Sequence, residues 1–267
     1  MTSLSRETLL AQYDEELRRR APYFDAAIRM ETDGAVVRLL GATPDAGNNC
    51  VLYSALDEKT AAAAIDSQVD FFRRLGRDFE WKFHEHDRPA SLRELLLSRG
   101  FVPEVDETIM SLSLTGERFS AAAPPGYQVR ALAGDEGLEA VFEVQAGVWK
   151  GEDLGWLNAS LARERAARPD AIHFHAAWSA GRPVCAGWTR LHGRFASLFG
   201  GSTLAEHRGR GLYRALLASR MDEARRRGAE YALVDAGPMS RPVLARLGFD
   251  PLTGTTPFVR RFGPPSK

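Results

Sequence analysis

The stretch from residue 203 to residue 213 reads Thr-Leu-Ala-Glu-His-Arg-Gly-Arg-Gly-Leu-Tyr and lies between an expected strand, Phe195 to Thr203, and an expected helix, Leu212 to Arg227. Gly209 and Gly211 alternate with arginines directly before the helix. Glycine lets a ligand approach the backbone closely, and the free N–H groups of a helix start attract anions. A pyrophosphate would fit such a turn, and arginine adds charge-assisted hydrogen bonds to phosphate. A basic turn that only caps the helix would have the same sequence.

The segments on either side of this loop predict an alternation of strands and helices. Gly200 and Gly201 stand near the end of the preceding strand, where paired glycines indicate a β-bulge, close approach of a ligand, or a plain strand end. After the long helix we expect a strand from Glu230 to Asp235, a short helix from Ser240 to Leu247 and a last strand around Pro257 to Phe262.

In this combination the sequence resembles the GCN5-related N-acetyltransferases (GNATs). The loop of that family has Arg or Gln, two residues, Gly, any residue, and then Gly or Ala. Arg208 and Gly211 match this pattern, whereas Tyr213 stands where a small residue is usual. The resemblance continues to the tail Arg246-Leu247-Gly248-Phe249 and covers about residues 126 to 262.

The resemblance implies that acetyl-coenzyme A (acetyl-CoA) lies in a V-shaped gap between the strands ending at Thr203 and Asp235. An amine would then attack the thioester directly, and a backbone donor near Gly200 and Gly201 would stabilise the oxyanion. The resemblance also implies a set of cofactor-binding residues, with the pantetheine near the first three and the pyrophosphate on the others: Ser202, Thr203, Leu204, Arg208, Gly209, Arg210, Gly211, Leu212 and Tyr213.

The acid and base of such a reaction have several candidates. An alkylammonium group has a pKa of roughly 10 and must lose a proton before it attacks, so a carboxylate is needed nearby. Asp235, Glu152 and Asp153 could accept that proton, or could be solvated surface carboxylates. Many GNATs place a tyrosine as general acid five residues before the Phe of the Gly-Phe tail, where this chain has Leu244. Ser240 could donate a proton instead, or could only cap a helix.

Aromatic and histidine side chains gather in the part of the chain that the resemblance makes the acceptor side. Trp149 and Trp156 flank a short loop and could form the wall of an acceptor pocket or pack in the core. His173 and His175 share one face of a strand from Ile172 to Trp178. They could be metal ligands, or this could be a half-solvated face of the strand. No further ligands stand at suitable spacing, so we expect no metal.

The N-terminal half repeats the order of elements found at the end of the chain. A helix, Gly76, a strand, a helix and Arg99-Gly100-Phe101 correspond to a helix, Gly228, a strand, a helix and Leu247-Gly248-Phe249. The shared order indicates either an internal duplication or a chance similarity between the ends of the two halves. Alignment on Gly76 and Gly228 puts Leu56-Asp57-Glu58-Lys59 opposite the glycine loop. Because this stretch has two acids and no glycine, the first copy should not bind the cofactor.

These patterns predict an α/β (α+β mixed sheet) fold class, with two GNAT-like domains in tandem and helices flanking each mixed sheet. A small, proline-rich segment from Gly116 to Gly126 separates a degenerate domain, residues 1–118, from a catalytic domain, residues 126–267. The degenerate copy would extend the sheet or form one wall of the acceptor cleft. The chain would be a monomer or a homodimer.

Composition narrows the possible partners and compartments. The chain has 35 Lys and Arg against 35 Asp and Glu, so no net positive charge attracts nucleic acid, and Arg225 to Arg227 suit the end of a helix. Two cysteines favour the reducing cytoplasm, and no apolar stretch approaches the roughly 18 residues of a membrane span. The expected function is acetyl transfer from acetyl-CoA to a primary amine of a small molecule or peptide. The alternative is a catalytically weak acyl-CoA-binding sensor or interaction module.

Overall fold

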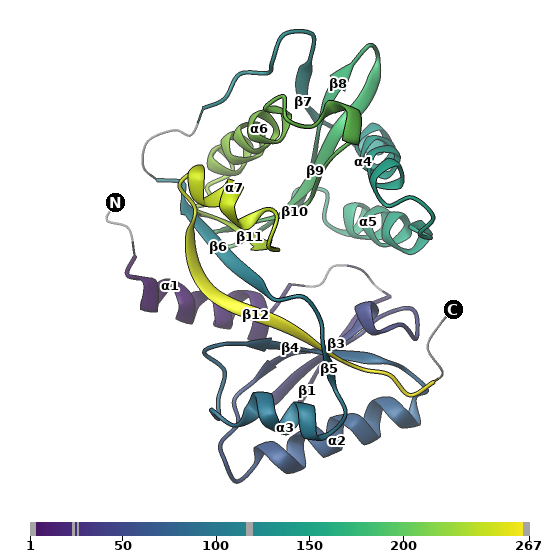
Figure 1. Ribbon diagram of the computed structural model, residues 1–267, viewed down its shortest axis with the longest axis vertical. Helices are drawn as coiled ribbons and strands as arrows, with labels where there is room; N and C mark the ends of the chain where they lie inside the picture. Colours follow the sequence, from purple (N-terminus) through teal and green to yellow (C-terminus); the bar gives the residue numbers. More distant parts are fainter. Residues whose placement is uncertain (1–3, 23–24, 26, 116–119, 264–267) are drawn as a thin grey trace. The chain divides into compact units, whose positions relative to one another are not determined.

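The computed structural model describes residues 4–22, 25, 27–115 and 120–263 (Figure 1). Contacts among these residues define two compact units. Within the described ranges, the N-terminal unit comprises residues 4–109, 236–243 and 251–263. The C-terminal unit comprises residues 110–235 and 244–250.

The N-terminal unit contains a sheet with the strand order β1-β2-β3-β4-β12, and β5 pairs with β12. β3 and β4 are parallel, and the other pairs are antiparallel. The strands are β1 (Arg29–Asp33), β2 (Val36–Leu40), β3 (Asn49–Ser54), β4 (Phe79–His84), β5 (Val102–Pro103) and β12 (Asp250–Arg260). The helices are α1 (Arg6–Tyr13), the π-helical η1 (Asp14–Arg19), the 3-10 turn η2 (Ala46–Asn48), α2 (Ala61–Arg74) and α3 (Leu92–Ser98).

Helix α2 covers this sheet with one apolar face. Ile65, Val69 and Phe72 recur at helical spacing and are buried in one core cluster with Phe79 and Trp81 of β4. The rings of Phe72 and Phe79 stack with centroids 4.2 Å apart. The N-terminal unit therefore has a hydrophobic core of its own.

The last strand of the chain belongs to this sheet. Thr255–Arg260 of β12 pair antiparallel with Phe79–His84 of β4, and Phe258 is fully buried in the same core cluster. The expected domains, residues 1–118 and 126–267, are consecutive segments, whereas the N-terminal unit also contains this strand. The difference arises because pairing across about 170 residues leaves no signature in the strand's own sequence, while the cut at 116–126 relied on local composition.

The C-terminal unit contains strands in the order β6-β11-β10-β9-β8-β7, where β6 begins three residues before the unit does. The strands are β6 (Glu107–Ser113), β7 (Gln128–Leu132), β8 (Ile172–Ser179), β9 (Arg182–His192), β10 (Phe195–Thr203) and β11 (Tyr231–Ala236). The helices are α4 (Gly134–Val148), α5 (Gly155–Ala167), the 3-10 turn η3 (Ala205–His207), α6 (Leu212–Arg226) and α7 (Arg241–Arg246), whose first three residues fall in the N-terminal unit.

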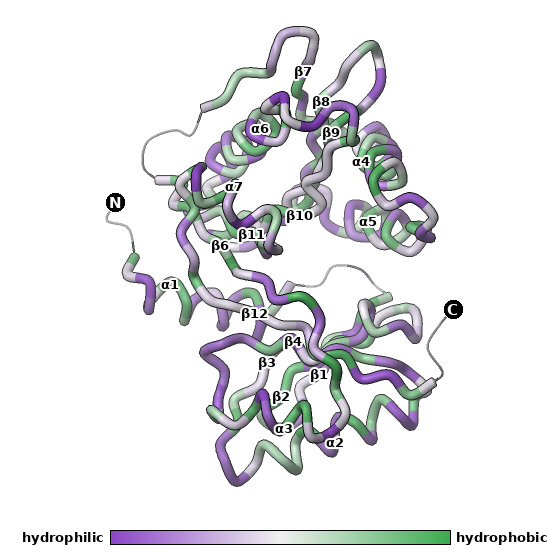
Figure 2. The backbone as a smooth tube through the Cα atoms, viewed as in Figure 1, coloured by the Kyte–Doolittle hydropathy of each residue, from purple (hydrophilic) through white to green (hydrophobic). Residues whose placement is uncertain are grey.

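Helices α4 and α6 of the C-terminal unit bury apolar side chains, and the backbone tube alternates between hydrophobic and hydrophilic along α6 (Figure 2). Leu212 and Leu216, one turn apart on α6, are buried in a core cluster with Val184 of β9. Val141 and Val144 of α4 enter a neighbouring cluster. The mixed sheet flanked by helices confirms the fold class predicted from the sequence.

Candidate functional site

Strands β10 and β11 are paired over only part of their length. Their parallel register joins Phe195–Ser197 to Tyr231–Leu233, whereas β10 continues to Thr203 and β11 to Ala236. Backbone polar groups in a protein need hydrogen-bond partners. Beyond Ser197, this edge of β10 can therefore offer its backbone to a ligand.

A β-bulge interrupts β10 where the sequence has its paired glycines. The register between β10 and β9 shifts between Phe199 and Ser202, and Gly200 adopts a φ of +60°. A Cβ atom on Gly200 would collide with the ring of Trp188. Glycine is thus required at this position both by the backbone conformation and by the lack of space.

The side chain of Gln145, from α4, stabilises the bulge. Its Nε2 donates to the carbonyl of Gly200 at 2.6 Å, and its Oε1 accepts from the Ser202 hydroxyl at 3.2 Å and from Trp149 Nε1 at 3.0 Å. Gln145 is only 3% exposed. Gln145 is not among the site residues expected from the sequence, and the signal that could have identified it is an amide between the apolar residues Val141, Val144 and Val148.

A buried cation lies beneath the same bulge. Arg220 of α6 is 1% exposed, and its guanidinium donates to the Thr189 hydroxyl at 3.0 Å and to the carbonyls of Phe199, at 3.1 Å, and Trp188. Burial lowers the pKa of Arg220 to about 10, so it remains protonated at neutral pH. The bulge is therefore held from one side by an amide and from another by a positive charge.

The loop after β10 leads directly into the N-terminus of α6. Gly209 and Gly211 have φ values of +72° and +82°, and no heavy atom lies within 4 Å of a Cβ built on Gly209. Gly211 is the N-cap of α6 and provides no side-chain cap. The N–H groups of the first helical turn thus lack a side-chain acceptor at the N-cap, and they carry the positive end of the helix dipole.

The arginines of the loop are exposed, and each is partly engaged by the backbone. Arg208 Nε donates to the Thr203 carbonyl at 3.0 Å, and Arg210 Nη2 donates to the Glu206 carbonyl at 3.4 Å. Their other N–H groups can bind an anion in front of the helix.

Tyr213 packs against the bulge. A Cβ atom on Gly201 would lie 2.7 Å from Tyr213 Cε2, and burial raises the pKa of the phenol. The large residue at position 213 is therefore accommodated by a glycine at position 201. The Leu204 N–H donates to the Val184 carbonyl at 2.9 Å, so it already has a partner within the protein.

The structure brings the expected cofactor-binding residues together but spreads the catalytic candidates over separate segments. Asp235 is partly buried at the end of β11. Glu152 and Asp153 are exposed between α4 and α5, and Asp153 Oδ1 accepts at 2.9 Å from the N–H two residues later. The Ser240 hydroxyl donates at 3.2 Å to a carbonyl three residues earlier, before α7, and belongs to the N-terminal unit. Leu244 is fully buried.

The histidines and tryptophans differ in burial. Trp149 and Trp156 are 51% and 48% exposed, so core packing is not their role. The expectation of a half-solvated face is wrong for His175, which is fully buried with both ring nitrogens unbonded. Burial lowers the pKa of His175 to about 3 and also lowers the pKa of His173. Among the described residues, no three His, Cys, Asp or Glu side chains are grouped to hold a metal ion.

Solved structures share this fold over almost the whole chain, although no protein-family model and no curated protein matches the sequence. A GCN5-related N-acetyltransferase from Kribbella flavida is 16% identical, with a TM-score of 0.71 and 98% of each chain covered. A tandem GNAT protein from the clavulanic acid biosynthesis pathway is 15% identical, with a TM-score of 0.67 and the same coverage. A GCN5-related N-acetyltransferase from Sphaerobacter thermophilus is 14% identical, with a TM-score of 0.65, over 98% of this chain and 88% of that one.

The fold is therefore that of the GCN5-related N-acetyltransferases. This chain is similar over nearly its full length to proteins of that fold, one of which is a tandem GNAT protein. Within the described ranges, the helices are too short or too polar to cross a membrane.

Proposed function

We propose that this protein transfers an acetyl group from acetyl-CoA to a primary amine. Three consecutive features carry the proposal. Strand β10 has a bulge at Gly200, the loop after it contains Gly209 and Gly211 with positive φ, and α6 begins at Gly211 without a side-chain cap. Such a helix start suits a pyrophosphate, because N–H groups and the dipole converge there. The fold of the solved acetyltransferases supports the same assignment.

The residues expected to hold the donor follow from these contacts. The N–H groups from Arg208 to Tyr213 would bind the pyrophosphate, aided by the exposed guanidinium groups of Arg208 and Arg210. The pantetheine amides would pair with β10 beyond Ser197, near Ser202 and Thr203, where pairing with β11 has ended. Leu204 would contribute its carbonyl or side chain, since its N–H is engaged.

The turn before α2 in the N-terminal unit supports a single donor site. Asp57 Oδ1 accepts from the N–H groups of Lys59 and Thr60 at 3.0 and 2.8 Å. A carboxylate thus lies in the turn directly before α2, which corresponds to the glycine loop in the alignment on Gly76 and Gly228. The hydrogen bond from the Thr60 hydroxyl, at 2.8 Å, and these backbone hydrogen bonds lower the pKa of Asp57 and keep it negatively charged, which disfavours a phosphate there. We therefore propose that the first copy is degenerate.

The chemical step needs a base, an oxyanion donor and a leaving group. The neutral amine forms a C–N bond to the thioester carbon, and the C–S bond breaks to release the thiolate of coenzyme A. Asp235 is the best-placed base of the candidates, because it is partly buried at the end of β11 while Glu152 and Asp153 are exposed. A backbone N–H of the bulge would stabilise the oxyanion. With Leu244 at the usual tyrosine position, water would protonate the thiolate.

The acceptor would be a small-molecule or peptide amine. Trp149 and Trp156 are exposed aromatic surfaces that suit one wall of its pocket. We place this reaction in the cytoplasm, in a monomer or homodimer, with no part for nucleic acid or membrane.

A second candidate function is an acyl-CoA-binding sensor without useful turnover. The observation that favours it is the full burial of Leu244 where a catalytic tyrosine would stand. The two functions share the donor site and differ only in chemistry.

An assay of free-thiol release from acetyl-CoA with a panel of primary amines separates them. Amine-dependent release that Gly211→Asp abolishes supports the enzyme. Gly228→Asp is the matched control. Gly228 also has a positive φ, of +87°, no heavy atom lies within 4 Å of a Cβ built on it, and it follows the C-terminal end of α6, away from the proposed donor site. Binding of acetyl-CoA without release, for every amine, would support the sensor instead.

A further inference from the structure

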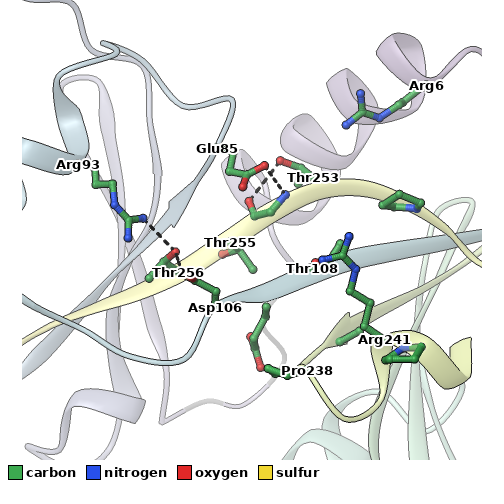
Figure 3. Close-up of a pocket in the computed structure, with 15 residues that line it drawn as sticks. Arg6, Glu85, Arg93, Asp106, Thr108, Pro238, Arg241, Thr253, Thr255 and Thr256 are labelled. Atoms are coloured by element: carbon green, nitrogen blue, oxygen red, sulfur yellow. Dashed lines mark hydrogen bonds between the residues drawn. The ribbon is translucent and has the colours of Figure 1, made fainter. Parts of the chain in front are cut away.

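The N-terminal unit contains a pocket of about 700 Å³ that the proposed acetyl transfer does not use (Figure 3). Its wall comes from segments far apart in sequence, represented by Arg6 of α1, Glu85 after β4, Asp106 before β6, Arg241 of α7 and Thr253 of β12. This volume lies within the range of about 300 to 1,000 Å³ found for small-molecule sites. All of its lining residues belong to the one unit.

The pocket carries both signs of charge in equal number. Its lining includes three arginines and three carboxylates, namely Arg6, Arg93, Arg241, Glu85, Asp106 and Glu107. Threonine hydroxyls contribute further polar atoms along β12 (Figure 3). A purely apolar ligand would displace water from these charged groups and offer them no hydrogen bonds in return, which costs free energy. The lining therefore matches a ligand that carries a positive and a negative group.

The charged groups at one end are held in place by the protein. The Thr256 hydroxyl donates to Asp106 Oδ1 at 2.5 Å and accepts from Arg93 Nη1 at 3.4 Å. Arg93 also lies over the ring of Phe258, 5.2 Å from its centroid. These contacts engage one oxygen of Asp106 and orient the carboxylate, while the hydrogen bonds of Oδ2 remain open to a ligand. A fixed carboxylate is a suitable partner for an ammonium group.

At the other end, the side chains of an arginine and a threonine are available to a ligand. Among the described residues, Arg241 forms no hydrogen bond or ion pair, and the Thr108 hydroxyl has no hydrogen-bond partner although Thr108 is only 8% exposed. Figure 3 shows Arg241 extending from α7 toward Thr108. The Thr108 hydroxyl lines the pocket with a proton that it can donate, so this position suits an anionic acceptor. A carboxylate could accept from both Arg241 and Thr108.

The spacing of the two ends limits the size of the ligand's charged head. Asp106 and Thr108 are two residues apart on one chain segment that leads into β6, so their Cα atoms are separated by about 7 Å. A compact head with an ammonium and a carboxylate on neighbouring carbons fits between them.

We propose that this pocket binds a small zwitterion of the α-amino-acid class, with its carboxylate at Arg241 and Thr108 and its ammonium at Asp106. The remaining volume holds the side chain of the ligand. The site requires no acetyl-CoA and stands independently of the acetyl-transfer proposal.

Calorimetric titration of the full chain, without acetyl-CoA, tests the proposal with three forms of each of the twenty common amino acids. The free amino acid carries both charges, the N-acetyl derivative only the carboxylate, and the amide only the ammonium. At least one free amino acid should bind at least about tenfold more tightly than both of its blocked forms, as the loss of one charge-assisted contact implies.

Variants assign the two ends. Arg241→Gln should remove the preference for the free acid over its amide, and Thr108→Val should weaken that preference without changing charge. Asp106→Asn should remove the preference for the free amine over its N-acetyl form. Arg246→Gln and Glu94→Gln, exposed residues outside the pocket lining, are the charge-matched controls and should bind as the wild type does.

The proposal is overturned if no free amino acid binds, or if binding is unchanged in Arg241→Gln and Asp106→Asn. Equal binding of the free and blocked forms would also overturn it. A loss of thiol-release activity, by contrast, bears only on the acetyl-transfer proposal, since these titrations do not involve the donor site.

Discussion

His175 should make the protein lose stability as the pH falls, and His175→Phe should remove that loss. His175 is fully buried in β8, and neither ring nitrogen has a hydrogen-bond partner. Burial lowers its pKa from 6.5 to about 3, and the nearby Arg220 guanidinium acts in the same direction. The folded state therefore holds a neutral imidazole that the unfolded chain would protonate below pH 6.5.

The sign and magnitude follow from these two values. Between pH 6.5 and 3 the unfolded state binds a proton that the folded state does not, so the free energy of unfolding falls as the pH falls. The loss is about 2 kcal/mol at pH 5 and approaches about 5 kcal/mol below pH 3, at 1.36 kcal/mol per pKa unit. Above pH 6.5 the imidazole is neutral in both states and contributes no pH dependence.

Urea unfolding at pH 7.5 and pH 5.0, at constant ionic strength, measures the effect. The free energy of unfolding of His175→Phe relative to wild type should rise by about 2 kcal/mol between pH 7.5 and pH 5.0. Phe174→Leu is the control, because it alters a buried neighbour on the same strand without removing a titrating group. If the difference between His175→Phe and wild type is the same at both pH values, His175 is not buried in the neutral form.

Two further predictions concern the bulge in β10. Gln145→Leu should lower the free energy of unfolding by about 1–3 kcal/mol in urea titrations, because the Gly200 carbonyl and the Ser202 hydroxyl lose their partner. A change below about 0.5 kcal/mol would show that Gln145 does not stabilise the bulge. Gly201→Ala should lower the free energy of unfolding by about 1–3 kcal/mol, because the added methyl group clashes with the Tyr213 ring. In a Tyr213→Ala background the same substitution should lower it by at least about 1 kcal/mol less. Additive effects in this double-mutant cycle would refute the contact.

Local features of the fold could be predicted from the sequence, because their causes are local. Gly209 and Gly211 predict a turn at the start of a helix that a ligand can approach closely; they lie directly before α6, and no heavy atom lies within 4 Å of a Cβ built on Gly209. The paired glycines in the expected strand Phe195 to Thr203 leave open a bulge, close approach of a ligand or a plain strand end, and the register shift shows that a bulge is present. In each case the residue type and its immediate neighbours determine the conformation.

Features that depend on distant residues could not be predicted. The strand around Phe258 is paired with β4, and nothing in its own pattern specifies that partner. His175 is fully buried in β8, a strand that α6 contacts, and a period of two along one strand does not reveal such a contact. The pocket near Asp106 and Arg241 joins segments separated by 135 residues, and each of these side chains alone has the sequence context of an ordinary surface residue.

The most direct test of the proposed function is the titration of acetyl-CoA into the purified protein, followed by its melting temperature. A ligand at 100 times its dissociation constant stabilises the folded state by about 2.7 kcal/mol, which shifts the midpoint by several degrees. The donor site proposed at the start of α6 predicts a shift for wild type and for Gly228→Asp and no shift for Gly211→Asp. An equal shift for all three proteins would place acetyl-CoA elsewhere, and the absence of a shift in wild type would contradict the assignment of an acetyl-CoA site to this loop.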